Sequence, residues 1–310
     1  HLLEEPESIM QASHGDPPQV GLFRNRNFML LWCAYGVSAI GDHLSEMAIL
    51  KTQDALNPIV DITPLSARIT FFFFVPFLVL SPIAGSLADR FSRRALMVIA
   101  DVARAAIVFE LGWLIGVASK WFSWGQFLPL TAVGVFAAFF SPARMAVLPT
   151  LIAPQQLVRA NGMIGGLGII ATMIAAAIGG KLADTYPASV AFRLDAATFA
   201  ASAVLLLCMR PPAREQNVAS KNRALGEIAD GFRYVLAHYR VRELLAVAAL
   251  VWFCGPLINS VIPAVVRDVY GGTYTLISVY RGLLGLGFII GAAIIISLGL
   301  QHSFALEDVF

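Results

Sequence analysis

Long apolar segments separated by short polar turns dominate this chain. The run F-F-F-F-V-P-F-L-V-L at residues 71–80 is followed by G-S-L-A-D-R-F-S-R-R at 85–94 and by A-L-M-V-I-A at 95–100. A helix needs about 20 mostly apolar residues to cross a hydrocarbon layer of about 30 Å. By that measure the pattern predicts eight membrane spans, over residues 28–50, 65–88, 95–118, 126–148, 161–182, 188–209, 243–266 and 275–299.

The composition agrees with a polytopic membrane protein. Of the 310 residues, 58% are hydrophobic and 14% are charged, whereas soluble domains carry about a quarter charged residues. The apolar runs are continuous, unlike the alternating strands of membrane β-barrels, so the fold class is all-α. The net charge of +2 is spread between apolar blocks and predicts no nucleic-acid partner. The cysteines are widely scattered, and no metal or cofactor is expected.

Lysine and arginine are distributed unequally between the turns. With a cytoplasmic N-terminus, the outer turns receive only Lys51, Lys120, Lys181 and Arg267, and the other cationic residues that flank the spans lie on the cytoplasmic side. Cytoplasmic loops of membrane proteins carry such an excess of positive charge. We therefore expect a multi-pass protein of the cell (inner) membrane with its N-terminus in the cytoplasm.

The spans divide the chain into four parts. Residues 1–21 are acidic and contain proline, which predicts a disordered cytoplasmic tail. Residues 22–210 form a six-helix N-terminal half, and 243–310 hold the first two helices of an incomplete C-terminal half. The cytoplasmic linker, 211–242, contains a predicted amphipathic helix. The apolar face of that helix consists of Leu225, Ile228, Phe232, Val235 and Leu236.

The stretch G-S-L-A-D-R-F-S-R-R after the second span, six spans and a long loop together resemble the major facilitator superfamily. The stretches beginning F-F-S-P-A-R-M at 139, A-F-R-L-D-A-A at 191 and I-P-A-V-V-R-D at 262, with Gly41–Asp42, are similar to its siderophore- and macrolide-exporter branch, including the enterobactin exporter. The resemblance covers nearly the whole chain after residue 22. It implies twelve spans in two halves, so we expect this chain, with eight, to be a fragment.

Two motifs of the family are altered here. Ser92 replaces the usual second glycine of the charged turn. The fifth span reads A-A-A-I-G-G at 175–180 where exporters often have G-P-x-x-G-G, so the direction of transport does not follow from this motif.

In the family, the acid of the charged turn contacts a helix end of the second half, and the arginines pair with nearby acids. A carboxylate is favourable near the positive N-terminus of a helix, and this contact closes the cytoplasmic side. For Arg93 and Arg94 the alternative is a pure topology signal. The resemblance assigns the gating motif to Gly85, Leu87, Asp89, Arg90, Arg93 and Arg94.

Charged residues inside the spans are the clearest candidates for function, because each is costly in hydrocarbon without a partner or a cavity. Asp101 and Arg104 share one helix face, and a structural ion pair is the alternative to a functional role. Asp42 has no partner on its own helix and is the candidate proton site. Glu46 and Glu110 lie near the outer surface, where simple exposure also explains them. The full set of proton and substrate candidates is Asp42, Glu46, Asp101, Arg104, Glu110, Arg193, Asp195 and Arg281.

Glycines recur in the fifth and eighth spans. A nucleotide-binding loop is excluded, because Ala171 and Ile290 occupy the place of the third glycine and no strand precedes either stretch. Small residues four apart instead predict close packing of membrane helices. The predicted packing positions are Gly162, Gly166, Gly179, Gly180, Gly287 and Gly291.

These observations predict a secondary active transporter that exports a small amphipathic molecule, a drug or siderophore, by proton antiport and alternating access. Its partners would be the small-molecule substrate, protons and the lipid bilayer, and it would act as a monomer. Two alternatives stay open: a lysophospholipid flippase-type transporter of the same fold, and an intramembrane lipid-modifying enzyme. The enzyme would need a nucleophile–base or metal constellation at membrane depth, and the scattered positions of the five histidines argue against it.

Overall fold

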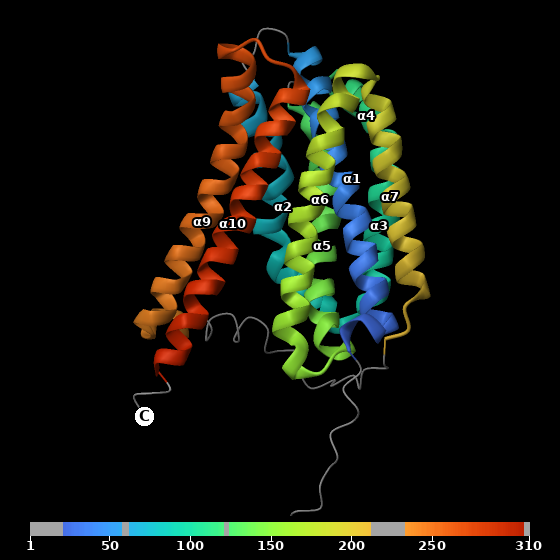
Figure 1. Ribbon diagram of the computed structural model, residues 1–310. Helices are drawn as coiled ribbons and strands as arrows, with labels where there is room; N and C mark the ends of the chain where they lie inside the picture. Colours follow the sequence, from blue (N-terminus) through green and yellow to red (C-terminus); the bar gives the residue numbers. More distant parts are fainter. Residues whose placement is uncertain (1–20, 58–61, 121–123, 212–232, 307–310) are drawn as a thin grey trace, which may run out of the picture.

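The computed structural model describes residues 21–57, 62–120, 124–211 and 233–306. This part of the chain is helical and contains no strand (Figure 1). The helices are α1 (Arg26–Leu56), α2 (Ile62–Arg90), α3 (Arg93–Phe109), α4 (Leu111–Ala118), α5 (Leu128–Leu151), α6 (Leu157–Thr185), α7 (Ala188–Cys208), α9 (Tyr239–Ala264) and α10 (Tyr274–Leu306). Short 3-10 turns are η1 (Leu22–Arg24), η2 (Gly125–Phe127) and η3 (Pro154–Gln156), and η5 (Val265–Val269) is π-helical.

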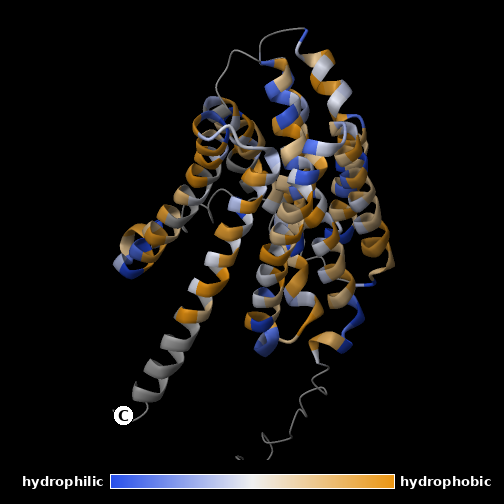
Figure 2. Cartoon of the chain, turned by 45° about the horizontal axis from the view of Figure 1, so that its top comes forward, coloured by the Kyte–Doolittle hydropathy of each residue, from blue (hydrophilic) through white to orange (hydrophobic). Residues whose placement is uncertain are grey.

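Every predicted span coincides with helix, and the third is divided at Glu110 into α3 and α4. Four helical segments are long and apolar enough to cross a membrane: Gly125–Leu151, Pro154–Thr185, Ala188–Cys208 and Tyr274–Gly291. The total of eight spans therefore stays a prediction. Large apolar side chains such as Trp113, Val158 and Leu250 are exposed, and Figure 2 shows hydrophobic residues along most of the helices. Such a surface suits contact with lipid.

The first six predicted spans form one bundle. In it α1 packs against α6 and α7, α3 packs against α5 and α7, and α2 packs against α5. The bundle closes where it begins, because Asn27 Nδ2 donates to the carbonyl of Arg210 (2.8 Å) and the Arg210 N–H donates to Asn27 Oδ1 (2.9 Å). Helix α10 lies along α6, and α9 lies beside α2 and α10 (Figure 1).

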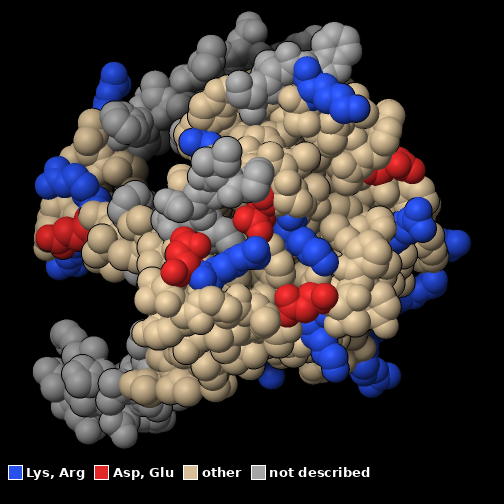
Figure 3. Space-filling view, turned by 90° about the horizontal axis from the view of Figure 1, so that it is seen from above, with Lys and Arg blue, Asp and Glu red and all other residues tan. Residues whose placement is uncertain are grey.

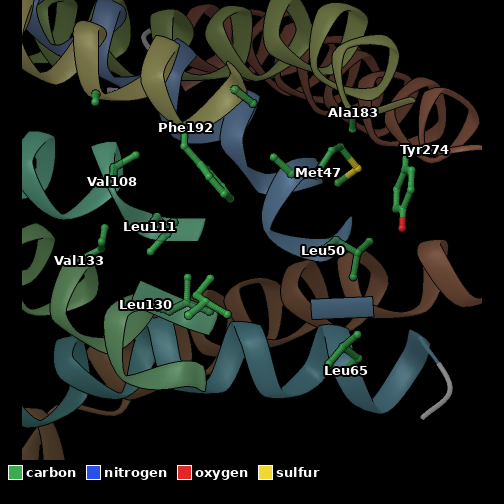
Figure 4. Close-up of a cluster of buried hydrophobic side chains, with 14 of the residues drawn as sticks. Met47, Leu50, Leu65, Val108, Leu111, Leu130, Val133, Ala183, Phe192 and Tyr274 are labelled. Carbon is green, nitrogen blue, oxygen red and sulfur yellow. The ribbon is translucent and has the colours of Figure 1, made fainter. Parts of the chain in front are cut away.

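Two clusters of buried apolar side chains occupy opposite ends of the bundle. One lies at the end where α10 begins and includes Phe127, Phe192, Val266, Tyr274 and Ile277 (Figure 4). The other lies at the end where α1 begins, around Phe28 and Met97, and its members all belong to residues 22–209. Within the described residues, α9, η5 and α10 therefore contribute only to the first cluster.

Most of the predicted tail and linker lies outside the described residues. Of the predicted amphipathic face, only Val235 and Leu236 are described, in a helical turn at 233–237.

Candidate functional site

A buried ion pair on α3 is hydrogen-bonded to α7 within the bundle. The Arg104 guanidinium contacts the Asp101 carboxylate one turn away, and Asp101 Oδ2 accepts a hydrogen bond from Ser202 Oγ (2.6 Å). Asp101 and Arg104 are 0% and 4% exposed, so both charges are shielded from solvent. The predicted structural ion pair is present.

Aromatic rings complete the surroundings of Arg104. Its guanidinium carbon lies 4.8 Å from the ring centroid of Phe140 and 4.2 Å from that of Phe199. A cation over an aromatic face gains electrostatic attraction, the more so when it is desolvated. Arg104 is therefore fixed by both an acid and two rings.

Asp42 of α1 is the accessible acid beside this pair. Its Oδ2 lies 3.8 Å from Arg104 Nη1, and its side chain is 37% exposed. The sequence showed no partner for Asp42 on its own helix, and the partner lies on α3. Asp42 therefore lies beside the fixed arginine and remains partly accessible.

Asp195 of α7 is held by hydroxyl groups. Ser45 Oγ donates to Asp195 Oδ2 (2.6 Å), and Thr198 Oγ1 donates to the Asp195 carbonyl (2.7 Å). A Cβ at Gly41 would lie 1.9 Å from Thr198 Oγ1 and 2.3 Å from Asp195 Oδ1. Glycine at position 41 thus lets α1 approach α7 closely enough for the contact between Ser45 and Asp195.

A second polar cluster joins α1, α6 and α10. Arg281 Nη1 contacts Glu46 Oε1 (2.6 Å), and His43 Nδ1 lies 3.5 Å from Glu46 Oε2. The other ring nitrogen of His43 lies 2.8 Å from the Thr172 hydroxyl. These side chains line a small pocket together with Ser278, whose hydroxyl is buried. This cluster links the six-helix bundle to the C-terminal helices.

His43 lies between the Thr172 hydroxyl and the Glu46 carboxylate, an arrangement that the sequence did not predict. It must be considered for the enzyme alternative, because hydrolases place a histidine between a hydroxyl and an acid. The Thr172 hydroxyl, however, also donates to the Gly168 carbonyl one turn earlier (2.9 Å), and Glu46 is engaged by Arg281. Nucleophilic catalysis needs a base oriented by its own partner and donors for the developing oxyanion. The arrangement therefore fits a charge-linked helix contact better than hydrolysis.

Two of the candidate residues lie apart from both clusters. Glu110 is exposed at the break between α3 and α4. Arg193 is exposed on α7, with its guanidinium carbon 5.8 Å from the Phe109 ring centroid. For Glu110, simple exposure was one of the two predicted explanations.

Sequence reasoning missed a polar network at the end where α10 begins. Asp184 at the end of α6 accepts hydrogen bonds from the backbone N–H of Tyr274 (3.2 Å) and of Thr275 (2.8 Å), and from the Thr275 hydroxyl (2.6 Å). A Cβ at Gly180 would lie 2.5 Å from the Tyr274 carbonyl oxygen. Asp184 therefore caps the N-terminus of α10, a favourable place for an anion.

The same end holds a second contact between the two parts. Arg267 of η5 pairs with Asp54 of α1 (2.7 Å), and the Tyr274 hydroxyl donates to Asp54 (3.1 Å). Lys51 Nζ donates to the carbonyls of Ala183 and Tyr186 at the end of α6. Acidic and basic residues lie side by side on this face in Figure 3. The network was missed because its members are far apart in the sequence.

The charged turn after α2 is only partly described. The side chains of Asp89 and Arg90 lie outside the described residues, Leu87 is half-buried, and Gly85 has open space beside it. Arg93 donates to the Ala146 carbonyl of α5, and Arg94 donates to the carbonyls of Leu206 (Nε, 2.9 Å) and Leu207. Arg94 thus caps the C-terminus of α7, where a cation is favoured. These arginines have a packing role in addition to any effect on topology.

Ser92, which replaces the second glycine of the family's charged turn, has a structural role here. It is the N-cap of α3, and its hydroxyl accepts from the Ala95 N–H (3.4 Å). Serine is among the residues most favoured at that position.

The predicted glycine contacts form at only one of the three pairs. Gly179 lies against the α1 backbone, 3.4 Å from its built Cβ to the Leu44 carbonyl oxygen, and Gly180 lies against the start of α10. At the other four predicted positions no atom lies within 4 Å of a built Cβ. These are Gly162, Gly166, Gly287 and Gly291. In the described part of the chain α6 and α10 diverge towards that end (Figure 1), and close packing at these four positions stays a prediction.

Within the described residues, no group of three or more His, Cys, Asp or Glu side chains is arranged to hold a metal ion. What the site offers is charge: two partly exposed acids on α1, Asp42 and Glu46, each beside an arginine of another helix.

Comparison with known proteins gives this geometry a context. The lysophospholipid transporter LplT of Serratia proteamaculans is 27% identical over 280 residues, covering 86% of this chain and 65% of the relative. LplT of Yersinia pestis (strain Pestoides F) is 26% identical over 280 residues, covering 86% and 64%. The chain thus spans just under two thirds of the length of these relatives. They are lysophospholipid transporters, so the expected siderophore-exporter branch is not supported. The profile of the Major Facilitator Superfamily matches residues 28–303, and the chain belongs to that family.

Proposed function

We propose that this chain belongs to a membrane transporter that moves lysophospholipids by alternating access. The lysophospholipid transporter, which was the alternative hypothesis from the sequence, therefore replaces export of drugs or siderophores as the main hypothesis. The observation that carries it is the similarity to lysophospholipid transporters over 86% of the chain, a stretch that includes most of the helices described.

The polar clusters suit a lipid with a charged headgroup. Asp42 and Glu46 present partly exposed carboxylates on one face of α1, with Arg104 and Arg281 beside them. Charges at this depth are retained where they bind substrates or ions. The apolar surface around them suits an acyl chain.

The direct test is transport by the full-length protein in proteoliposomes. Fluorescent lysophosphatidylethanolamine should cross the bilayer faster than in protein-free vesicles, whereas a catecholate siderophore trapped inside should not leave faster. Siderophore export without lysophospholipid movement would contradict the proposal and restore the export reading.

Asp42 is the residue for the coupling test. Asp42→Asn removes one carboxylate but leaves Arg104 paired with Asp101, so the bundle should stay folded. If Asp42 is the proton site, a pH gradient should no longer change the transport rate of the Asn variant, and Asp42→Glu should retain part of the response. An unchanged response in the Asn variant would remove Asp42 from coupling.

A further inference from the structure

Arg144 of α5 is a partly buried arginine without an acid. Its Nη1 is buried and makes no hydrogen bond in the described structure, and no carboxylate of the described residues pairs with it. Arg104 and Arg281 differ, since each contacts a carboxylate. An uncompensated charge within a membrane helix is costly, and such residues mark functional sites.

Tyr35 of α1 fixes the direction of this guanidinium. The Arg144 guanidinium carbon lies 4.1 Å from the Tyr35 ring centroid. A Cβ at Gly168 of α6 would lie 2.7 Å from the Tyr35 hydroxyl oxygen, so glycine at that position makes room for the ring. The pair lies where α1, α5 and α6 meet. Stacking orients the guanidinium plane and leaves its edge for hydrogen bonds.

There is room for a ligand on the neighbouring surface of α6. Gly165 is about one turn from Gly168, and no atom lies within 4 Å of a Cβ built on Gly162, Gly165 or Gly166. Arg144 precedes the last residue of α5, Leu151, by 151 − 144 = 7 residues, or about 10 Å of helix. Arg144 therefore lies towards the end of the bundle where α1 begins, since the Leu151 carbonyl accepts a hydrogen bond from Asn25.

We propose that Arg144, stacked on Tyr35, binds the phosphate group of the transported lipid near the end of the bundle where α1 begins. A guanidinium donates two parallel hydrogen bonds to a phosphate, and the anion would supply the counter-charge that the protein does not. The inference rests on the proposed function for the lipid that carries the phosphate. The anion site itself can be tested separately.

The experiment measures binding to the purified full-length protein in detergent. The probes are lysophosphatidylethanolamine, a monoacylglycerol with the same acyl chain but no phosphate, and inorganic phosphate as competitor. Arg144→Gln should weaken binding of lysophosphatidylethanolamine by about tenfold or more, as expected for lost hydrogen bonds to a charged group, and leave monoacylglycerol binding unchanged. Arg159→Gln, which removes an exposed arginine of α6, is the control and should change neither.

Two further variants guard against misfolding. Arg144→Lys keeps the positive charge but loses the two parallel N–H donors of the guanidinium. It should bind lysophosphatidylethanolamine more weakly than wild type and more tightly than the Gln variant. Tyr35→Phe keeps the ring and should have a small effect. A folded Arg144→Gln protein that binds lysophosphatidylethanolamine as tightly as wild type overturns the inference.

The phosphate arm separates the two proposals. Competition by inorganic phosphate in wild type but not in Arg144→Gln supports an anion site, even if the protein moves no lysophospholipid. Lysophospholipid transport that is unaffected by Arg144→Gln supports the proposed function and refutes the site.

Discussion

The two ends of the contact between α6 and α10 differ sharply. Where α10 begins, Asp184 caps it, Gly180 touches its backbone, and Tyr274 and Ile277 enter the buried cluster. Towards the other end, Gly287 and Gly291 have open space beside them, and Ile290 and Ile294 are exposed. Figure 1 shows α9 and α10 leaning away from the bundle at that end.

If the protein works by alternating access, as we propose, this difference corresponds to one conformation of that cycle. We call the end where α10 begins the joined end, and the opposite end the separated end. With the predicted cytoplasmic N-terminus, the separated end faces the cytoplasm and the joined end faces outward. The joined end is held by directional polar contacts, which form or break as units, so it suits a two-state change better than a continuous apolar surface would.

The largest effect is expected from a side chain at Gly180. Gly180→Val would place atoms on the Tyr274 carbonyl and the Thr275 backbone, whereas Gly287→Val enters open space. Overpacking costs about 3 kcal/mol or more in this case, because the clash is with backbone atoms, which cannot move aside as the end of a flexible side chain can. In a background without native cysteines, a cysteine at the buried position Ile277 should react faster with a thiol reagent in the Gly180 variant only. Equal reactivity in both variants would contradict the difference between the ends.

Next is the pair that links α1 to α10. Arg281→Gln or Glu46→Gln alone should destabilise the contact between α1 and α10 by about 1.5–3 kcal/mol, because each removes a hydrogen bond between two charged groups. The exchange of both, Glu46→Arg with Arg281→Glu, should recover part of that loss in thermal unfolding. Additive losses in the exchanged protein would mean that the two residues do not act as a pair.

The cap of α10 should have a smaller effect. Asp184→Asn keeps the shape but weakens three hydrogen bonds and removes the charge at the helix N-terminus, at a cost of about 0.5–2 kcal/mol. The full-length protein should then favour the outward-open state, as judged by labelling of Ile277→Cys from outside. Asp268→Asn, an exposed acid of η5, is the control. If Asp268→Asn shifted the labelling equally, the cause would be the loss of one negative charge and not the loss of the helix cap.

The smallest effect on this chain is expected at Asp89, in the turn at the separated end. Asp89 is predicted to contact a helix end in the second half, at about 0.3–2 kcal/mol. Asp89→Asn should move the full-length protein towards its inward-open state and slow turnover. It should leave the stability of residues 1–310 nearly unchanged. If Asp89→Asn changed cytoplasmic cysteine accessibility equally in the full-length protein and in residues 1–310 alone, the partner of Asp89 would lie within residues 1–310.

The sequence was sufficient for features that depend on local spacing. Apolar runs located the helices, and the three-residue spacing of Asp101 and Arg104 predicted their ion pair. Contacts between distant segments could not be read in this way. Nothing in the sequence connects Asp184 with Thr275, or Asp42 with Arg104, because helix rotation and tilt decide which side chains meet.

The glycines show the same limit. Gly162 and Gly180 look alike as small residues on one apolar helix, yet only Gly180 meets another helix. A spacing motif states that close approach is sterically allowed. Whether a second helix lies there depends on the divergence of α10 from α6.

The reciprocal hydrogen bonds between Asn27 and Arg210 bring the two ends of the six-helix bundle within bonding distance of each other. The path of the backbone through this half is therefore nearly a closed ring. A short peptide joining these ends, with a new opening in the turn between α4 and α5, would give a circularly permuted half with the same helix contacts. The order in which its helices are made and inserted would change, although their final arrangement would not.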